Sequence, residues 1–333
     1  MFSHLRHRVV QAPMAGTSTP ELAVAVCEAG ALGFLALGTL DAAGARKAIR
    51  SVRQGTDRAF GVNLFCHAPA RRDAAREAGW IETLRPAFGR FGAEPPTALS
   101  EIYPTFRGND AVLAVLLAER PAIVGCHFGL PGSDQIAALK AAGCRLWATA
   151  TSVAEGRAVR DAGFDVIVAQ GYEAGGHRGI FDPDGPDGRL DHLALVRALL
   201  PLGLPVVAAG AIMDRDSARI AMDAGAVAVQ CGTAFLRAPE SAAPPAHRAA
   251  LSGGRTVITR AISGRPARCL VNDFTVIDDA AAADYPVAYD IGKALNAAAL
   301  AQGNTGYGAF WAGTGATASL ARPAADTVRA ISP

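Results

Sequence analysis

The sequence predicts an α/β fold in which eight parallel strands close into a (β/α)8, or TIM, barrel that carries a small, mostly helical second domain or lid. Three observations predict it: eight short apolar runs, alanine-rich helical stretches between them, and glycines at the junctions. Each run is too continuously apolar to leave a solvated face, as expected of a parallel sheet covered by helices. An open doubly wound sheet is the alternative to the closed barrel. The predicted strands span residues 9–14, 32–37, 60–65, 122–128, 145–150, 166–171, 205–210 and 227–232.

The predicted helices begin at residues that cap helix N-termini well. Thr19-Pro20 opens the helix after the first strand, Ser152 the helix after the fifth, and Asp214 the helix after the seventh. The side-chain oxygens of Ser, Thr and Asp accept hydrogen bonds from the free N–H groups of a first helical turn, and proline suits the first helical position. These caps support the alternation of strand and helix.

Two stretches interrupt the repeat. Residues 66–110 are too many for one βα unit, and 71–79 and 80–91 are predicted to be two extra helices. From 236 to 305 the alternation stops, which predicts a small lid domain over one end of the barrel. The chain from 307 to 330 is predicted to return to the barrel. The predicted division is therefore 1–235 plus 306–333 for the barrel and 236–305 for the lid.

The composition favours a globular cytoplasmic protein. The chain has 333 residues, 50% of them hydrophobic, which is ample for one large core. A formal net charge of +2 gives no reason to expect nucleic acid or a membrane surface as partner. No apolar run is long enough to span a bilayer, and the N-terminus lacks the apolar region of a secretory signal. Six cysteines without CxxC spacing are expected to be buried free thiols.

The loops after the seventh and eighth strands predict a phosphate site. Ala209, Gly210 and Ala211 lead into a helix, and Gly232 and Thr233 follow the eighth strand. Barrel enzymes work at the C-terminal ends of their strands and often hold a phosphate at these two loops. Small residues let backbone N–H groups approach an anion. Small residues that merely allow close packing are the alternative for each loop taken alone.

The loop after the sixth strand is the most distinctive segment of the chain. It reads Gln170-Gly-Tyr-Glu-Ala-Gly175-Gly176-His177-Arg-Gly. Four glycines suggest backbone laid close against a flat ligand, with His177 presented at the barrel mouth. Histidine suits base chemistry near neutral pH. A solvent-exposed loop histidine is the alternative.

Other strand ends supply further candidates for a pocket. Pro13, Met14 and Ala15 follow the first strand, and Asn63 on the third could serve the edge of a ring as both donor and acceptor. His127 ends the fourth strand and is expected to line the pocket or to be hydrogen-bonded in its rim. No strand end supplies the carboxylates of a metal site, so we expect no metal.

Together these motifs resemble the nitronate monooxygenases, formerly called 2-nitropropane dioxygenases. The resemblance covers roughly residues 9–240 and continues more loosely to Trp311-Ala-Gly313. It rests on the segments QAPMAGTSTPELAVAVCEAGALG, GVNLF, HFGLP, VAQGYEAGGHRG, PVVAAGAI, VQCGTAFL and SGRPAR.

The resemblance implies one non-covalent FMN and a nitronate substrate, with O2 as oxidant and a carbonyl compound and nitrite as products. The phosphate would lie on Ala209, Gly210, Ala211, Gly232 and Thr233. The ring would lie against Pro13, Met14 and Ala15, with Asn63 and Gln170 at its polar edge and Gly175 and Gly176 beside it. His177 would act as base on neutral nitroalkanes or position an anionic nitronate, for which propionate 3-nitronate is the substrate that the resemblance suggests.

The sequence departs from the family pattern in two places. Ala211 stands where the pattern has a second glycine, a change that costs little if its φ angle is negative. Thr314 replaces a longer amide in the late WAG motif, which puts a C-terminal contact to the flavin pocket in doubt.

Two other functions stay open from the sequence. An NAD(P)H-dependent FMN reductase of quinones or enoyl thioesters would share the same loop. A flavin-free phosphate-binding lyase or isomerase is disfavoured because Lys47, Lys140 and Lys293, the three lysines that could form a Schiff base, lie in predicted helices. The sequence is compatible with a monomer or a homodimer.

Overall fold

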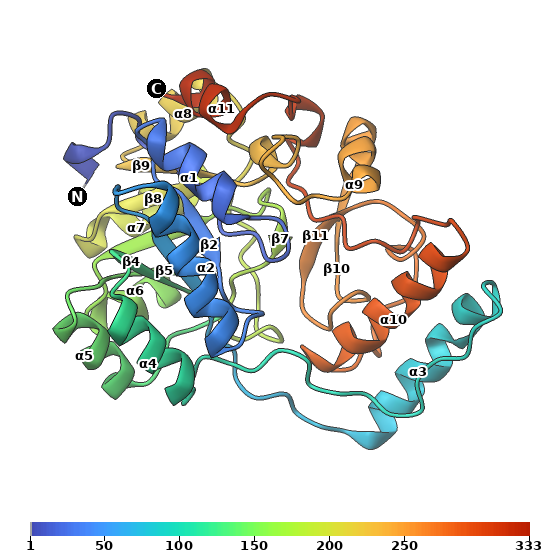
Figure 1. Cartoon of the computed structure of the whole chain (residues 1–333). Helices are drawn as coiled ribbons and strands as arrows, with labels where there is room; N and C mark the ends of the chain where they lie inside the picture. The colour runs from blue at the N-terminus through green and yellow to red at the C-terminus, as the bar shows by residue number, and fades with distance from the viewer. Residues whose placement is uncertain (1) are drawn as a thin grey trace.

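The computed structural model describes residues 2–333 and contains the predicted barrel (Figure 1). Eight parallel strands pair in the order β1-β9-β8-β6-β5-β4-β3-β2. The ring closes between β1 and β2, because the Gln11 N–H donates to the Leu32 carbonyl at 2.9 Å and the Leu32 N–H donates to the Val9 carbonyl at 3.0 Å. The strands are β1 Val9–Gln11, β2 Phe34–Ala36, β3 Gly61–Phe65, β4 Ile123–His127, β5 Arg145–Ala150, β6 Val166–Gln170, β8 Val206–Ala209 and β9 Ala228–Cys231.

Helices cover the outside of this ring, and the three predicted caps are confirmed. Thr19, Ser152 and Asp214 each accept a hydrogen bond from the backbone of the helix that follows. Apolar side chains fill two layers, one inside the ring around Phe34 and Trp147 and one between strands and helices. The covering helices are α1 Pro20–Glu28, α2 Ala42–Gly55, α4 Asp110–Glu119, α5 Ser133–Ala141, α6 Val153–Asp161, α7 His192–Leu199, α8 Arg215–Asp223 and α11 Ala324–Ile331.

A second unit stands beside the barrel mouth, and we call it the cap. It consists of α3 Ala74–Gly89, β10 Thr256–Thr259, β11 Ala267–Leu270 and α10 Val287–Ala301 (Figure 1). Its core joins residues far apart in the chain, with Trp80 and Phe88 of α3 packed among Phe274, Ile291 and Leu295. A short helix, α9 Pro245–Ala250, lies between the last barrel strand and the cap sheet.

The prediction of two helices in the insertion was wrong. One continuous helix, α3, replaces them, with Asp73 as its N-cap. Gly79, at the expected break, is exposed within this helix, where a glycine costs about 1 kcal/mol relative to alanine without ending the helix. The first predicted strand, 9–14, was also too long. β1 ends at Gln11, because Pro13 lacks the N–H that pairing in a sheet needs.

Two antiparallel strands in the cap were not predicted. β10 pairs with β11, and β11 also pairs with β7, the dipeptide Gly176–His177 in the loop after β6. The loop is thereby joined to the cap sheet. The six cysteines are free and buried, as expected. Among the described residues, no helix is long and apolar enough to cross a membrane.

Candidate functional site

One cavity of about 610 Å³ lies between the barrel mouth and the cap. This volume is within the ordinary range of small-molecule sites. Every site residue predicted from the sequence lines it: Pro13, Met14, Ala15, Asn63, His127, Gln170, Gly175, Gly176, His177, Ala209, Gly210, Ala211, Gly232 and Thr233. The carboxyl ends of eight different strands converge here, which is why residues scattered along the chain meet.

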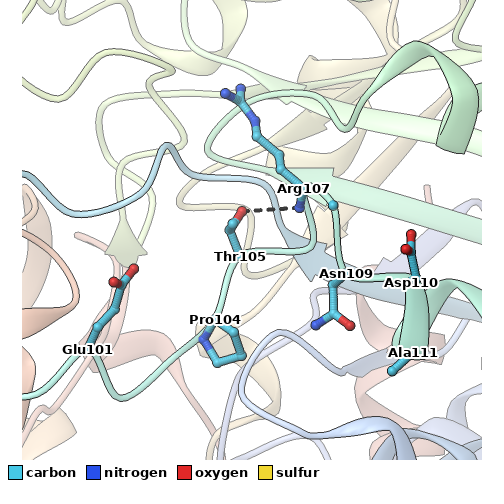
Figure 2. Close-up of a pocket in the computed structure, with 8 residues that line it drawn as sticks. Glu101, Pro104, Thr105, Arg107, Asn109, Asp110 and Ala111 are labelled. Atoms are coloured by element: carbon cyan, nitrogen blue, oxygen red, sulfur yellow. Dashed lines mark hydrogen bonds between the residues drawn. The ribbon is translucent and has the colours of Figure 1, made fainter.

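A second hollow of about 580 Å³ lies at the surface, before α4 (Figure 2). Figure 2 shows Arg107 extending away from it, while the Arg107 backbone N–H donates to Thr105 Oγ1 at 3.3 Å. Most of its lining, including Glu101 and Asp110, is solvent-exposed. None of the predicted site residues lies in it, so the deep cavity is the candidate site.

One end of the deep cavity presents unpaired backbone N–H groups. Within residues 2–333, the amides of Ala211 and Gly232 donate no hydrogen bond. A Cβ added to Gly232 would touch the Cβ of Ala12 at 3.4 Å and Met14 Sδ at 3.5 Å, both ordinary contacts. Both residues are half-buried at the cavity wall, so their amides are free to donate to a ligand bound there.

The backbone conformation of Ala211 differs from the one expected from the sequence. Its φ is +51°, in the left-handed region, whereas a negative φ was the condition for a harmless departure from the glycine pattern. An alanine in this conformation is strained, and glycine is not. The second departure, Thr314, is exposed and does not line the cavity, although the preceding Gly313 N–H donates to Thr233 Oγ1 at 2.9 Å. The Thr314 N–H still donates to the Glu173 carbonyl at 3.0 Å.

His177 is held at the other end by its backbone and by its ring. Its carbonyl accepts from Gln170 Nε2 at 2.9 Å and from His127 Nε2 at 3.3 Å. Its own Nε2 lies 2.8 Å from Ser263 Oγ. Because a carbonyl only accepts, His127 must carry its proton on Nε2 and accept from Thr149 Oγ1 at Nδ1, 2.9 Å away. The exposed-loop alternative for His177 is therefore wrong.

The two glycines before His177 are required by contacts within the protein as well as by their place in the cavity wall. A Cβ on Gly175 would lie 2.4 Å from the carbonyl carbon of Ala312, and Gly176 has a φ of +76°. The loop thus needs glycine for close approach to the chain at Ala312 and for its turn into β7. Protein contacts therefore account for glycine at these two positions, and the flat ligand beside them stays a prediction.

Burial keeps the histidines of the site neutral. It lowers the pKa of His177 and of His127 to about 3, and the nearby Arg265 guanidinium lowers both further. Burial likewise lowers the pKa of His67 and of His247 to about 4. At neutral pH these imidazoles are uncharged.

An aromatic and cationic wall from the cap was not predicted. Tyr285, Tyr289 and Lys293 recur every four residues into and along α10, and all line the cavity together with Tyr103 from the insertion. The Lys293 ammonium lies 4.8 Å from the Tyr103 ring centre. Residues four apart share a helix face, so the spacing was a signal. The sequence did not show that this face would turn toward the barrel.

The fold and this cavity define a TIM-barrel protein with a small-molecule site at the C-terminal ends of its strands. Comparison with known proteins is more specific. The family model "Nitronate monooxygenase" matches residues 1–332. A nitronate monooxygenase from Paraburkholderia phytofirmans is 53% identical over 96% of this chain and 90% of its own, and one from Pseudomonas aeruginosa is 49% identical over 98% and 95%. The crystal structure of nitroalkane oxidase from Streptomyces ansochromogenes aligns with a TM-score of 0.92 and 38% identity, covering 99% of this chain and 95% of that one.

The chain therefore belongs to the nitronate monooxygenase family, and the predicted family and barrel are confirmed. It is an oxidoreductase of a family that is generally flavin-dependent.

Replacement of Ala211 by glycine is expected to stabilise the protein by about 1 kcal/mol, because it relieves a left-handed alanine. Urea unfolding of Ala211→Gly against the wild type measures this. A variant of lower stability than the wild type would contradict the strain.

Stability is expected to fall as the pH drops from 6.5 to 5. The pKa values of four buried histidines are lowered in the folded state, so the unfolded chain binds protons first and each histidine costs about 2 kcal/mol at pH 5. Urea unfolding at pH 7 and pH 5 tests this, and His67→Leu should show a smaller difference. Equal stability at both pH values would contradict neutral burial.

Proposed function

We propose that this protein uses FMN and O2 to oxidise alkyl nitronates to a carbonyl compound and nitrite. The observation that carries the proposal is the charge of the cavity. Among the described residues no Asp or Glu lines it, and its one formally charged lining side chain is Lys293. An anionic substrate and an anionic phosphate both suit such a cavity.

The residues present fit FMN. The unpaired amides of Ala211 and Gly232 and the hydroxyl of Thr233 would hold the phosphate, and Ala209 and Gly210 leave it room. Pro13, Met14 and Ala15 would support the ring, while Asn63 and Gln170 offer amides to its edge beside Gly175 and Gly176. When bound, FMN would take electrons from the nitronate and pass them to O2.

His177 is proposed to position the nitronate by donating a hydrogen bond. Ser263 Oγ lies 2.8 Å from His177 Nε2 and 3.3 Å from the Arg265 carbonyl, and its one proton can go to either acceptor. We infer that it goes to the nearer His177 Nε2, which places the ring proton on Nδ1, the nitrogen without a partner among the described residues. With a pKa near 3, His177 is a weak base, which favours a substrate that arrives already deprotonated. His127 would hold the His177 backbone in place rather than contact the reacting atoms.

His177→Asn tests this role, because asparagine keeps a donor and removes the base. With propionate 3-nitronate, nitrite release and O2 consumption should fall less than tenfold, because the donor is kept, while the flavin stays bound. His177→Leu, which has no donor, is the matched control and should raise the nitronate KM. A nitronate KM as high in His177→Asn as in His177→Leu would contradict the donor role.

Gly232→Val tests the phosphate site. The φ of Gly232 is −107°, which any residue adopts, and its neighbours tolerate a Cβ, so the fold should persist. The added branches would instead occupy the cavity beside the proposed phosphate. Purified Gly232→Val should hold less FMN than the wild type, with Gly232→Ala between them. Undiminished flavin content in the valine variant would place the phosphate elsewhere.

A further inference from the structure

A buried guanidinium stands behind the His177 end of the cavity. Arg265 lies between β10 and β11 and is only 2% exposed. One of its terminal amino groups donates to the Ile180 carbonyl, and its Nε has no partner among the described residues. The guanidinium carbon lies 4.2 Å from the centre of the Phe128 ring. Arg178, equally buried, instead pairs with Asp187 at 2.8 Å, whereas no carboxylate of residues 2–333 pairs with Arg265.

Phe128 separates this charge from the cavity. The Phe128 ring lines the cavity, and its centre lies 5.6 Å from that of the His177 ring and 5.4 Å from that of Tyr285. The Phe128 backbone is held at a φ of +72°, a conformation that a phenylalanine adopts only when its surroundings require it. Arg265 is therefore one aromatic ring away from the place where His177 meets a substrate.

Among residues 2–333 no charged group forms an ion pair with Arg265, although the carboxylates of Glu155 and Asp284 oppose part of its field. Glu155, Asp284, Arg260 and the Tyr285 hydroxyl act on it from the surrounding elements. Glu155 already accepts from the Thr151 and Phe181 backbones, and Asp284 accepts from Arg71. Burial lowers the pKa of Arg265 only to about 10, so it stays protonated at neutral pH.

The field of a buried charge acts at longer range than that of an exposed one, because water and salt do not screen it. Lys293 is exposed at the cavity mouth, so its attraction is screened. Among charged groups, Arg265 makes the largest contribution to the lowered pKa of His67, His127 and His177. Its positive potential therefore reaches all three imidazoles.

We propose that Arg265 is a positioning residue that makes the His177 end of the cavity selective for anions, acting through the Phe128 ring without touching the substrate. Because the nearby histidines are neutral, Arg265 is the buried positive charge that attracts the bound anion at this end of the cavity. The identity of that anion as a nitronate rests on the proposed function, but the binding of an anion does not.

The test is isothermal titration calorimetry of the flavin-loaded protein with sodium nitrite. Arg265→Met keeps the length and the apolar packing but removes the charge, and it should weaken nitrite binding about tenfold, the factor expected for one charge acting through the protein interior. Arg265→Lys restores the charge and should bind nitrite within about threefold of the wild type. With propionate 3-nitronate, Arg265→Met should raise KM and leave kcat within about threefold.

Arg145→Met is the control for the loss of one positive charge. Arg145 begins β5, at the end of the strand opposite the cavity, and its guanidinium pairs with Asp165 at 3.0 Å. Arg145→Met should bind nitrite as the wild type does. Wild-type affinity in Arg265→Met, or equal loss in Arg265→Lys, would overturn the assignment.

A second test uses the wild-type protein, so it does not depend on whether a variant folds. Nitrite affinity should stay constant from pH 5.5 to pH 8, because His67, His127 and His177 are neutral over this range and burial raises the pKa of Tyr285 and Tyr289. Affinity that tightens as the pH falls through 6.5 would show that a histidinium holds the anion and would overturn the proposal. Nitrite binding without nitronate turnover would refute the proposed function alone.

Discussion

The two-residue pairing between β7 and β11 is the contact on which the site depends. Gly176 and His177 pair with Arg268 and Ala267, so the loop after β6 is a strand of the cap sheet as well as a barrel loop. This pairing fixes the backbone of His177 at the junction of barrel and cap. It also explains why the loop is rich in glycine: the chain must turn at Gly176 and approach the segment at Ala312 closely before it can pair.

The electrostatic character of the cavity follows from this junction. The same pairing that places His177 brings the segment from Ser263 to Arg265 behind it, so one hydroxyl orients the imidazole and one guanidinium charges its surroundings. Burial keeps the imidazole neutral, and the cavity lining carries no carboxylate among the described residues. A neutral hydrogen-bond donor in a positive field suits a substrate that is already an anion and makes proton abstraction by His177 inefficient.

The sequence predicted the barrel and the residues at its mouth because both depend on local signals. Continuous apolar runs specify buried parallel strands, and the ends of such strands converge whatever the loops contain. The cap was less predictable. β10 and β11 are short, and β11 also pairs with β7 from a distant part of the chain. The face of α10 that carries Tyr289 and Lys293 is set by packing on distant α3. The strain at Ala211 was hidden for the same reason, since its φ angle belongs to the folded loop.

The most direct test of the account is an anaerobic visible spectrum of the purified protein, recorded before and after separate additions of propionate 3-nitronate and NAD(P)H. A cavity that holds FMN beside a site for anionic nitronates predicts flavin absorption that changes with the nitronate and not with the nicotinamide. Bleaching by NADH or NADPH alone would contradict the account in favour of a reductase. A colourless protein that takes up no added FMN would contradict the flavin site itself.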